Sequence, residues 1–194
     1  MQYPLNLNFK LFAFAPQISV TDANGDLIFY VKQKRFKLKE EIIVYADVKK
    51  LQPLFYIKAD RIIDFSAVYK FSDVDGNYIG SVKRQGMKSL WRARYDIFDG
   101  ETSTMNIQEK NPWVKVADAL FAEIPIVGLF TDYVFNPKYI VSRNDENVVM
   151  HLEKIPSFLS RQFTIKASDR LNSRQEEQVL LSLLMMLLLE RNRG

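Results

Sequence analysis

Residues 173–194 read SRQEEQVLLSLLMMLLLERNRG, and the middle of this stretch, 179–189, is apolar at every position except Ser182. A helix that is apolar on all sides has to be enclosed, because an ordinary surface helix keeps one polar face in water. Lipid, a partner chain or the rest of the same domain could enclose it. Which of these three encloses the helix decides the fold.

The apolar run is too short to cross a bilayer. At about 1.5 Å per residue it makes about 16 Å of helix, against a bilayer core of about 30 Å. Ser173 and Glu176 form the S-x-x-E pattern of a capping box directly before the run. The sequence therefore predicts a helix over about 173–191 that is buried in its own domain. A dimerisation helix and a tail anchor are the alternatives.

The composition fits a single domain spanning residues 1–194. The chain has no cysteine, which excludes disulfides, thiolate metal sites and cysteine nucleophiles and fits a cytoplasmic protein. The small-residue pattern at 13–15 lacks the apolar core of a signal peptide. A net charge of +4 favours anionic surfaces but falls short of a dedicated nucleic-acid tail.

The pattern between residues 17 and 166 predicts an antiparallel β-sandwich or β-barrel. Short segments of two-fold apolar alternation are separated by turn signals such as Asn24-Gly25 and Asp99-Gly100. In 91–97 this alternation directs Trp91, Ala93, Tyr95 and Ile97 to the core and the residues between them to solvent. The predicted strands are 17–21, 27–34, 51–59, 68–72, 78–83, 91–98, 103–109, 139–142, 148–154 and 163–166.

The segment 112–137 interrupts this pattern and is interpreted as a helix-loop insertion. Residues 114–122 predict a short amphipathic helix, and 124–130 form an apolar connection punctuated by proline. An apolar loop is unusual in water, so this connection is a candidate partner surface. The alternative is a plug that crosses the core. The candidate partner-binding residues are Ile126, Val127, Leu129 and Phe130.

Several stretches, taken in order, resemble the tubby carboxyl-terminal-like superfamily and, within it, the LURP-one-related branch. They are ISVTDANGDLIFYVK at 18–32, KSLWRARYDI at 88–97, FTIK at 163–166 and the apolar helix at 175–189. The resemblance implies a mainly β fold, a closed antiparallel barrel of about 12 strands around a buried hydrophobic carboxyl-terminal helix. Leu183, Leu184, Leu187 and Leu188 should then be buried on every side.

The same superfamily includes tubby proteins, which bind phosphoinositide headgroups through basic surface residues, and phospholipid scramblases, which have a similar barrel. This chain lacks a cysteine cluster for lipidation, a spanning segment and an acidic calcium loop. Scramblase activity is therefore not expected.

Recognisable catalytic motifs are absent from the sequence, so we expect no enzyme activity, no cofactor and no metal. His151 is the only histidine, and Glu153 stands at same-face spacing from it. This pair is interpreted as a solvated strand histidine beside a surface carboxylate rather than as a general base and its orienting acid. Asp73 and Asp75 match part of a calcium loop, but a role in the turn explains them.

Two basic clusters remain as candidate binding residues. If their strands lie close together, they form an outward cationic patch suited to phosphate groups. Ordinary solvation of an exposed barrel wall is the alternative. Nucleic acid is not expected, because no aromatic stacking platform accompanies the cations. The clusters are Lys32, Lys34, Arg35, Lys37 and Lys39, and Lys83, Arg84, Lys88, Arg92 and Arg94.

The resulting hypothesis is a non-catalytic intracellular module, cytoplasmic or peripheral at the membrane, that binds phosphoinositide or an anionic membrane surface. The alternative is a protein-interaction scaffold that uses the apolar connection 124–130. The lipid-binding hypothesis assigns the ligand contacts to Lys32, Lys34, Arg35, Lys83, Arg84, Lys88, Arg92 and Arg94.

Overall fold

Buried and outward-facing side chains alternate along the strands of this protein. In β1 (Leu5–Lys10), for example, Leu5, Leu7 and Phe9 are almost completely buried, while the residues between them face outward. Successive side chains of a strand point to opposite faces, so this pattern places one face of the sheet on a core. The computed structural model describes residues 1–10, 17–32, 41–61, 67–86, 93–110, 138–155 and 160–191.

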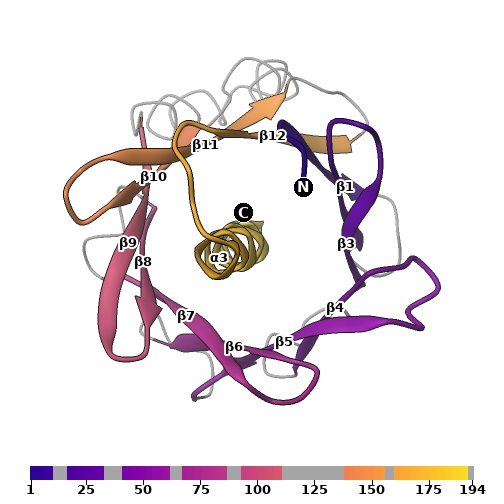
Figure 1. The fold of residues 1–194 in the computed structure, drawn as a ribbon, viewed down its shortest axis with the longest axis horizontal. Helices are drawn as coiled ribbons and strands as arrows, with labels where there is room; N and C mark the ends of the chain where they lie inside the picture. Colours follow the sequence, from indigo (N-terminus) through magenta and orange to yellow (C-terminus); the bar gives the residue numbers. More distant parts are fainter. Residues whose placement is uncertain are drawn as a thin grey trace, which may run out of the picture.

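The described strands form one closed barrel in which every strand pairs antiparallel with its neighbours in sequence, and β12 pairs with β1 to close the ring (Figure 1). The strands after β1 are β2 (Gln17–Thr21), β3 (Leu27–Lys32), β4 (Ile42–Tyr45), β5 (Pro53–Ala59), β6 (Val68–Asp73), β7 (Tyr78–Arg84), β8 (Arg94–Asp99), β9 (Thr102–Glu109), β10 (Lys138–Arg143), β11 (Val148–Ile155) and β12 (Ser160–Ala167). The twelve-stranded barrel inferred from the resemblance is confirmed.

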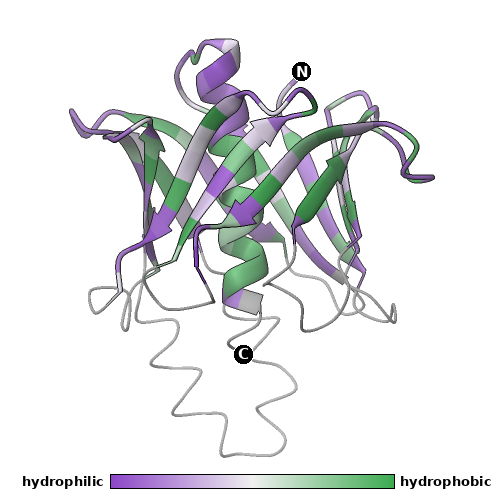
Figure 2. Cartoon of the chain, turned by 90° about the horizontal axis from the view of Figure 1, so that it is seen from below, coloured by the Kyte–Doolittle hydropathy of each residue, from purple (hydrophilic) through white to green (hydrophobic). Residues whose placement is uncertain are grey.

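The helix α3 (Ser173–Arg191) runs along the inside of the barrel (Figures 1 and 2). Every side chain from Gln178 to Leu188 is buried, including the four leucines for which burial was predicted. The helix lies against the wall formed by β6, β7 and β8. Its apolar residues therefore face the barrel interior on all sides, and the prediction of a helix enclosed by its own domain is confirmed.

Gly80 of β7 marks the closest approach between helix and wall. A Cβ atom at this position would lie 2.8 Å from Cγ of Gln178 and 3.0 Å from the backbone oxygen of Phe98. Gln178 is itself buried and donates a hydrogen bond from Nε2 to the backbone oxygen of Ile79, 2.8 Å away. The absence of a side chain at Gly80 thus allows Gln178 to attach the helix to the wall.

The amino-terminal cap of α3 differs from the prediction by one residue. Asn172, not Ser173, accepts the capping hydrogen bond: its Oδ1 receives the backbone N–H of Gln175 at 2.9 Å. Gln175 returns the contact, because its Oε1 accepts the backbone N–H of Asn172 at 3.2 Å. Glu176 accepts a hydrogen bond from the hydroxyl of Tyr3 at 2.7 Å. The capping box is therefore N-x-x-Q, and Glu176 ties the helix to the residues before β1.

Two strands, β1 and β4, were missing from the sequence prediction, whereas the other ten correspond to predicted segments with shifted ends. The turn between β2 and β3 is as expected, since Gly25 has φ of 86°. The predicted insertion at 112–137 lies wholly outside the described residues.

Replacing Asn172 with alanine should lower the free energy of unfolding by about 1 kcal/mol, because a backbone N–H of the first helical turn loses its acceptor. The matched change Ser173→Ala should alter stability by less than about 0.5 kcal/mol. Urea unfolding followed by circular dichroism measures both. A larger loss for Ser173→Ala than for Asn172→Ala would contradict this assignment of the cap.

Candidate functional site

The five connections between strands that the structure describes in full lie at the end where α3 begins, because each joins an even-numbered strand to the next odd-numbered one. Acidic side chains shape these turns. Asp22 accepts the backbone N–H groups of Asn24 and Asp26 at 2.9 and 3.1 Å, and Asp73 accepts those of Asp75 and Asn77 at 3.0 and 2.8 Å. The interpretation of Asp73 and Asp75 as turn residues is therefore confirmed.

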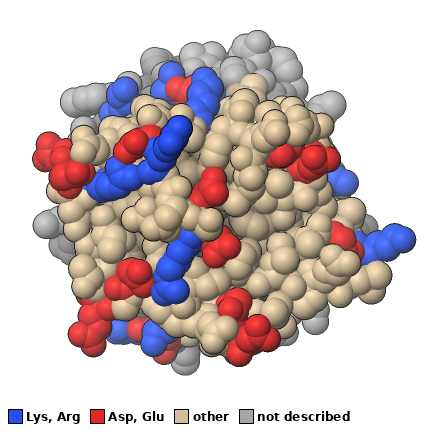
Figure 3. Space-filling view, in the orientation of Figure 1, with Lys and Arg blue, Asp and Glu red and all other residues tan. Residues whose placement is uncertain are grey.

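This end of the barrel is rich in carboxylates, and Figure 3 looks directly onto it. Some cations lie here as well, but Arg143 and Arg174 are paired with Asp169 and Asp99 respectively. The acidic residues of this end are Asp22, Asp26, Asp47, Asp73, Asp75, Asp99, Glu101, Asp145, Glu146, Asp169, Glu176 and Glu177.

The opposite end of the barrel is basic. Some of its outward cations form ion pairs with described carboxylates, for example Lys58 with Glu41, Arg61 with Asp60 and Lys138 with Glu153. Four lysines form no ion pair with another described residue, and they lie at or next to the ends of β1, β3, β7 and β9. We call these four the rim lysines: Lys10, Lys32, Lys83 and Lys110.

The charge difference between the two ends follows the direction of α3. The helix begins at the acidic end and finishes at the basic end. A helix dipole places partial positive charge at the amino terminus and partial negative charge at the carboxyl terminus, so each end of the barrel complements the nearer helix terminus. The basic end therefore has a structural role within the domain in addition to any role in binding.

The structure brings some of the predicted basic residues to this end but not into one compact patch. Lys32, Lys83 and Arg94 lie at the basic end, and β4, β5 and β6 separate β3 from β7 around the ring. The cations of the described strands thus form a ring and not a single cluster. The other predicted residues lie outside the described residues: Lys34, Arg35, Lys37, Lys39, Lys88 and Arg92, together with Ile126, Val127, Leu129 and Phe130.

Arg84 corrects the prediction of an outward cation. Its side chain is only 7% exposed and lies inside the barrel, where Nη2 is 3.4 Å from Oε1 of Glu190 on α3. The guanidinium carbon lies 5.9 Å from the ring centroid of Tyr95. The sequence of β7 could have predicted this inward position, because Gly80, Val82 and Arg84 alternate along the strand and share its inward face. Arg84 is therefore unavailable to a ligand on the outer wall.

Arg84 belongs to a buried polar cluster around the last turn of α3. The Tyr95 hydroxyl donates a hydrogen bond to Oε1 of Glu190 at 2.7 Å. Burial, and then the charge of Glu190, raises the pKa of Tyr95, and burial with Glu109 and Glu190 raises the pKa of Tyr139. Both tyrosines remain protonated at neutral pH, so Tyr95 can act as a donor to Glu190. The cluster anchors the carboxyl-terminal end of the helix.

His151 and Glu153 both lie on the outer face of β11, but Glu153 interacts with lysines. Its Oε1 is 3.2 Å from Nζ of Lys138 and its Oε2 is 3.3 Å from Nζ of Lys166, and these hydrogen bonds hold the pKa of Glu153 below its usual range. The described residues contain no cluster of three or more histidine, aspartate or glutamate side chains placed to hold a metal ion. No helix in the described part of the chain is long and apolar enough to cross a membrane.

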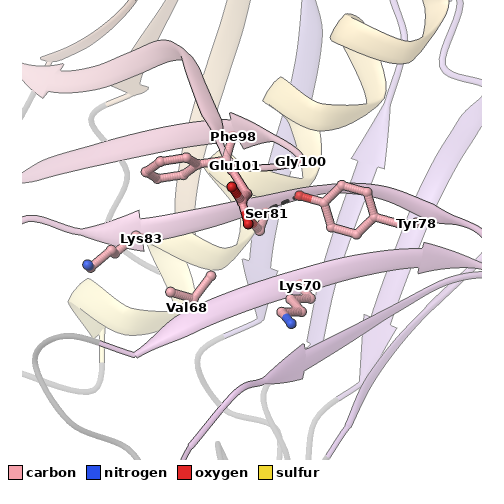
Figure 4. Close-up of a pocket in the computed structure, with 8 residues that line it drawn as sticks. All are labelled: Val68, Lys70, Tyr78, Ser81, Lys83, Phe98, Gly100 and Glu101. Atoms are coloured by element: carbon pink, nitrogen blue, oxygen red, sulfur yellow. Dashed lines mark hydrogen bonds between the residues drawn. The ribbon is translucent and has the colours of Figure 1, made fainter.

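A shallow groove of about 460 Å³ lies on the outer wall over β6, β7 and β8 (Figure 4). It combines two ammonium groups, two hydroxyl groups, a carboxylate and apolar surface. Sequence reasoning missed this feature, because its residues become neighbours only through the pairing of three strands. The lining residues are Val68, Lys70, Tyr78, Ser81, Lys83, Phe98, Gly100 and Glu101.

Comparison with known proteins gives one family and one solved structure. A family model described as LURP-one-related matches residues 27–188. The X-ray structure of a protein from Arabidopsis thaliana is similar to this chain, with 15% sequence identity, a TM-score of 0.49, and coverage of 98% of this chain and 92% of that chain. Among curated proteins, no match was found.

Replacing Arg84 with methionine should lower the free energy of unfolding by about 3 kcal/mol, because the nearly buried Glu190 loses its cation. Adding Glu190→Met to this variant should restore part of the loss. The control Lys58→Met breaks an exposed ion pair and should cost less than about 1 kcal/mol. Urea unfolding of the three variants measures these differences. Equal losses for Arg84→Met and Lys58→Met would show that the buried pair does not anchor the helix.

Proposed function

The chain belongs to the LURP-one-related family, and for this member we propose a non-catalytic, intracellular binding role. In this proposal the basic end of the barrel binds phosphate-bearing anionic surfaces, either a phosphoinositide headgroup or an anionic membrane. The single observation that carries the proposal is the set of rim lysines, Lys10, Lys32, Lys83 and Lys110, at one end of the barrel without ion pairs to described residues.

A ring of lysines suits a flat anionic surface better than a small isolated anion. Lysines spread around the end of a barrel can contact several headgroups at once, and each cation near an anionic leaflet contributes about 1 kcal/mol. The carboxylates at the other end are repelled by the same surface. Attraction at one end and repulsion at the other would orient the barrel with its basic end toward the lipid.

Nucleic acid is a weaker candidate for the same end. Binding of single strands commonly uses aromatic side chains on which bases stack. Every aromatic side chain in the described part of the chain is buried or half-buried. The partly exposed Tyr78 and Phe98 rings lie beside one rim lysine, Lys83, but the ring of cations as a whole lacks a stacking platform among the described residues, which favours a lipid surface.

Co-sedimentation with liposomes tests the proposal. The wild-type chain should bind vesicles of phosphatidylcholine with phosphatidylserine, should not bind pure phosphatidylcholine, and should dissociate as salt rises. The variant Lys32→Glu plus Lys110→Glu should bind at least about tenfold more weakly, since it reverses two charges worth about 1 kcal/mol each. The matched control Lys49→Glu plus Lys50→Glu changes two exposed lysines at the acidic end and should bind like the wild type.

A second set of vesicles, with phosphatidylinositol bisphosphate at the same total charge, separates the two forms of the proposal. Tighter binding to these vesicles indicates recognition of a headgroup, and equal binding indicates a general anionic surface. Absence of salt-sensitive binding by the wild type, or equal losses in the rim variant and the control, would refute the proposal.

A further inference from the structure

The groove on the outer wall is built by the register of three strands. Lys70 pairs with Ser81, Ser81 pairs with Phe98, and Val68 pairs with Lys83, so outward side chains of β6, β7 and β8 lie side by side. Gly100 and Glu101, which form the turn between β8 and β9, complete the lining (Figure 4). The groove is therefore a fixed feature of the barrel wall and is separate from the buried polar cluster.

The floor of the groove carries an almost buried hydroxyl. Ser81 is only 4% exposed, yet its side chain lines the groove. The Tyr78 hydroxyl donates a hydrogen bond to Oγ of Ser81 at 3.3 Å, and the proton of Ser81 can therefore serve another acceptor. Figure 4 shows the Tyr78 ring and the Phe98 ring on either side of Ser81. The hydroxyl lies between two aromatic surfaces.

Two ammonium groups border this floor. In the pairing of β6 with β7, Lys70 and Lys83 are diagonal neighbours, and the Cβ atoms of such a pair are on the order of 7 Å apart. Neither lysine forms an ion pair with another described residue. An anion bound in this part of the groove can be reached by both flexible side chains and would be attracted by both charges. This side of the groove is complementary to one acidic group.

The remaining lining limits the charge of a ligand. Val68, Phe98 and the Tyr78 ring supply apolar surface, and the exposed carboxylate of Glu101 also borders the groove. A ligand with several negative charges would place one of them near Glu101. A ligand with one acidic group and an apolar body would satisfy both the lysines and the apolar surface.

We propose that the groove over β6, β7 and β8 binds a small amphipathic monoanion, an aromatic or acyl acid. Its acidic group lies between Lys70 and Lys83 and accepts a hydrogen bond from Ser81, and its apolar body packs on Phe98 and Val68. This inference goes beyond the proposed function, because it concerns the side wall of the barrel and a different class of ligand. Lys83 is common to the two surfaces.

Fluorescence titration of the full chain with 8-anilinonaphthalene-1-sulfonate, an aromatic monoanion, tests the inference. Lys70→Gln plus Lys83→Gln should weaken binding at least about tenfold through the loss of both cations. Glu101→Gln should tighten binding a few-fold, because it removes a repulsive charge. The matched control Lys166→Gln, an exposed lysine on β12 across the barrel, should bind like the wild type. Octanoate should displace the probe, and inorganic phosphate at equal ionic strength should not.

Three results would overturn the inference: no saturable binding by the wild type, equal affinity in the double lysine variant, or displacement by inositol hexakisphosphate more readily than by octanoate. The single variant Lys70→Gln separates this inference from the lipid proposal, because Lys70 is not a rim lysine. It should weaken binding of the probe and leave vesicle binding unchanged. The double variant Lys32→Glu plus Lys110→Glu should weaken vesicle binding and leave binding of the probe unchanged.

Discussion

A barrel of twelve strands is too wide for its own inward side chains to fill, and this constraint governs the rest of the structure. The helix α3 occupies the space that would otherwise be empty, with every side chain from Gln178 to Leu188 buried. The dependence is mutual, because a helix apolar on all faces needs an enclosure and the barrel needs an apolar filling. Since the helix has no free face, ligands and partners have access to the described domain through its wall and its two ends.

Polar contacts fix the position of the helix along the barrel. Near its start, Gln178 is hydrogen-bonded to the backbone of Ile79 beside the tight contact at Gly80. At its last turn, Glu190 meets Arg84 and the Tyr95 hydroxyl inside the barrel. The barrel ends carry the charges that a helix dipole favours, acidic where the helix begins and basic where it finishes. The same distribution that suits the helix also supplies the lysine ring of the proposed lipid-binding end.

Local patterns in the sequence were enough to predict the central helix and most hairpins, and the family resemblance implied the barrel. Features that depend on distant partners were not predicted. The short apolar β4 has no two-fold period to recognise, and β1 is completed by β12, far away in the sequence. The predicted cap was one residue too late because two capping motifs, N-x-x-Q at 172–175 and S-x-x-E at 173–176, overlap in the sequence. In the structure Glu176 instead accepts a hydrogen bond from Tyr3, which the sequence does not indicate. The prediction that Arg84 points outward was wrong because it relied on the charge of the side chain and not on its inward position in the alternation of β7. Its partner, Glu190, lies on the helix, far away in the sequence. The groove depends on register across three strands.

The most direct test of this account is native-state hydrogen exchange of the backbone amides in the buried part of α3. If the helix is the core of the barrel, these amides should exchange only when the whole domain unfolds. Their free energy of opening and its dependence on urea should then equal those of β7 and β8, the strands on which the helix packs. Exchange of the helix at a clearly lower free energy, while the strands stay protected, would show that the barrel persists without its helix and would contradict the central claim.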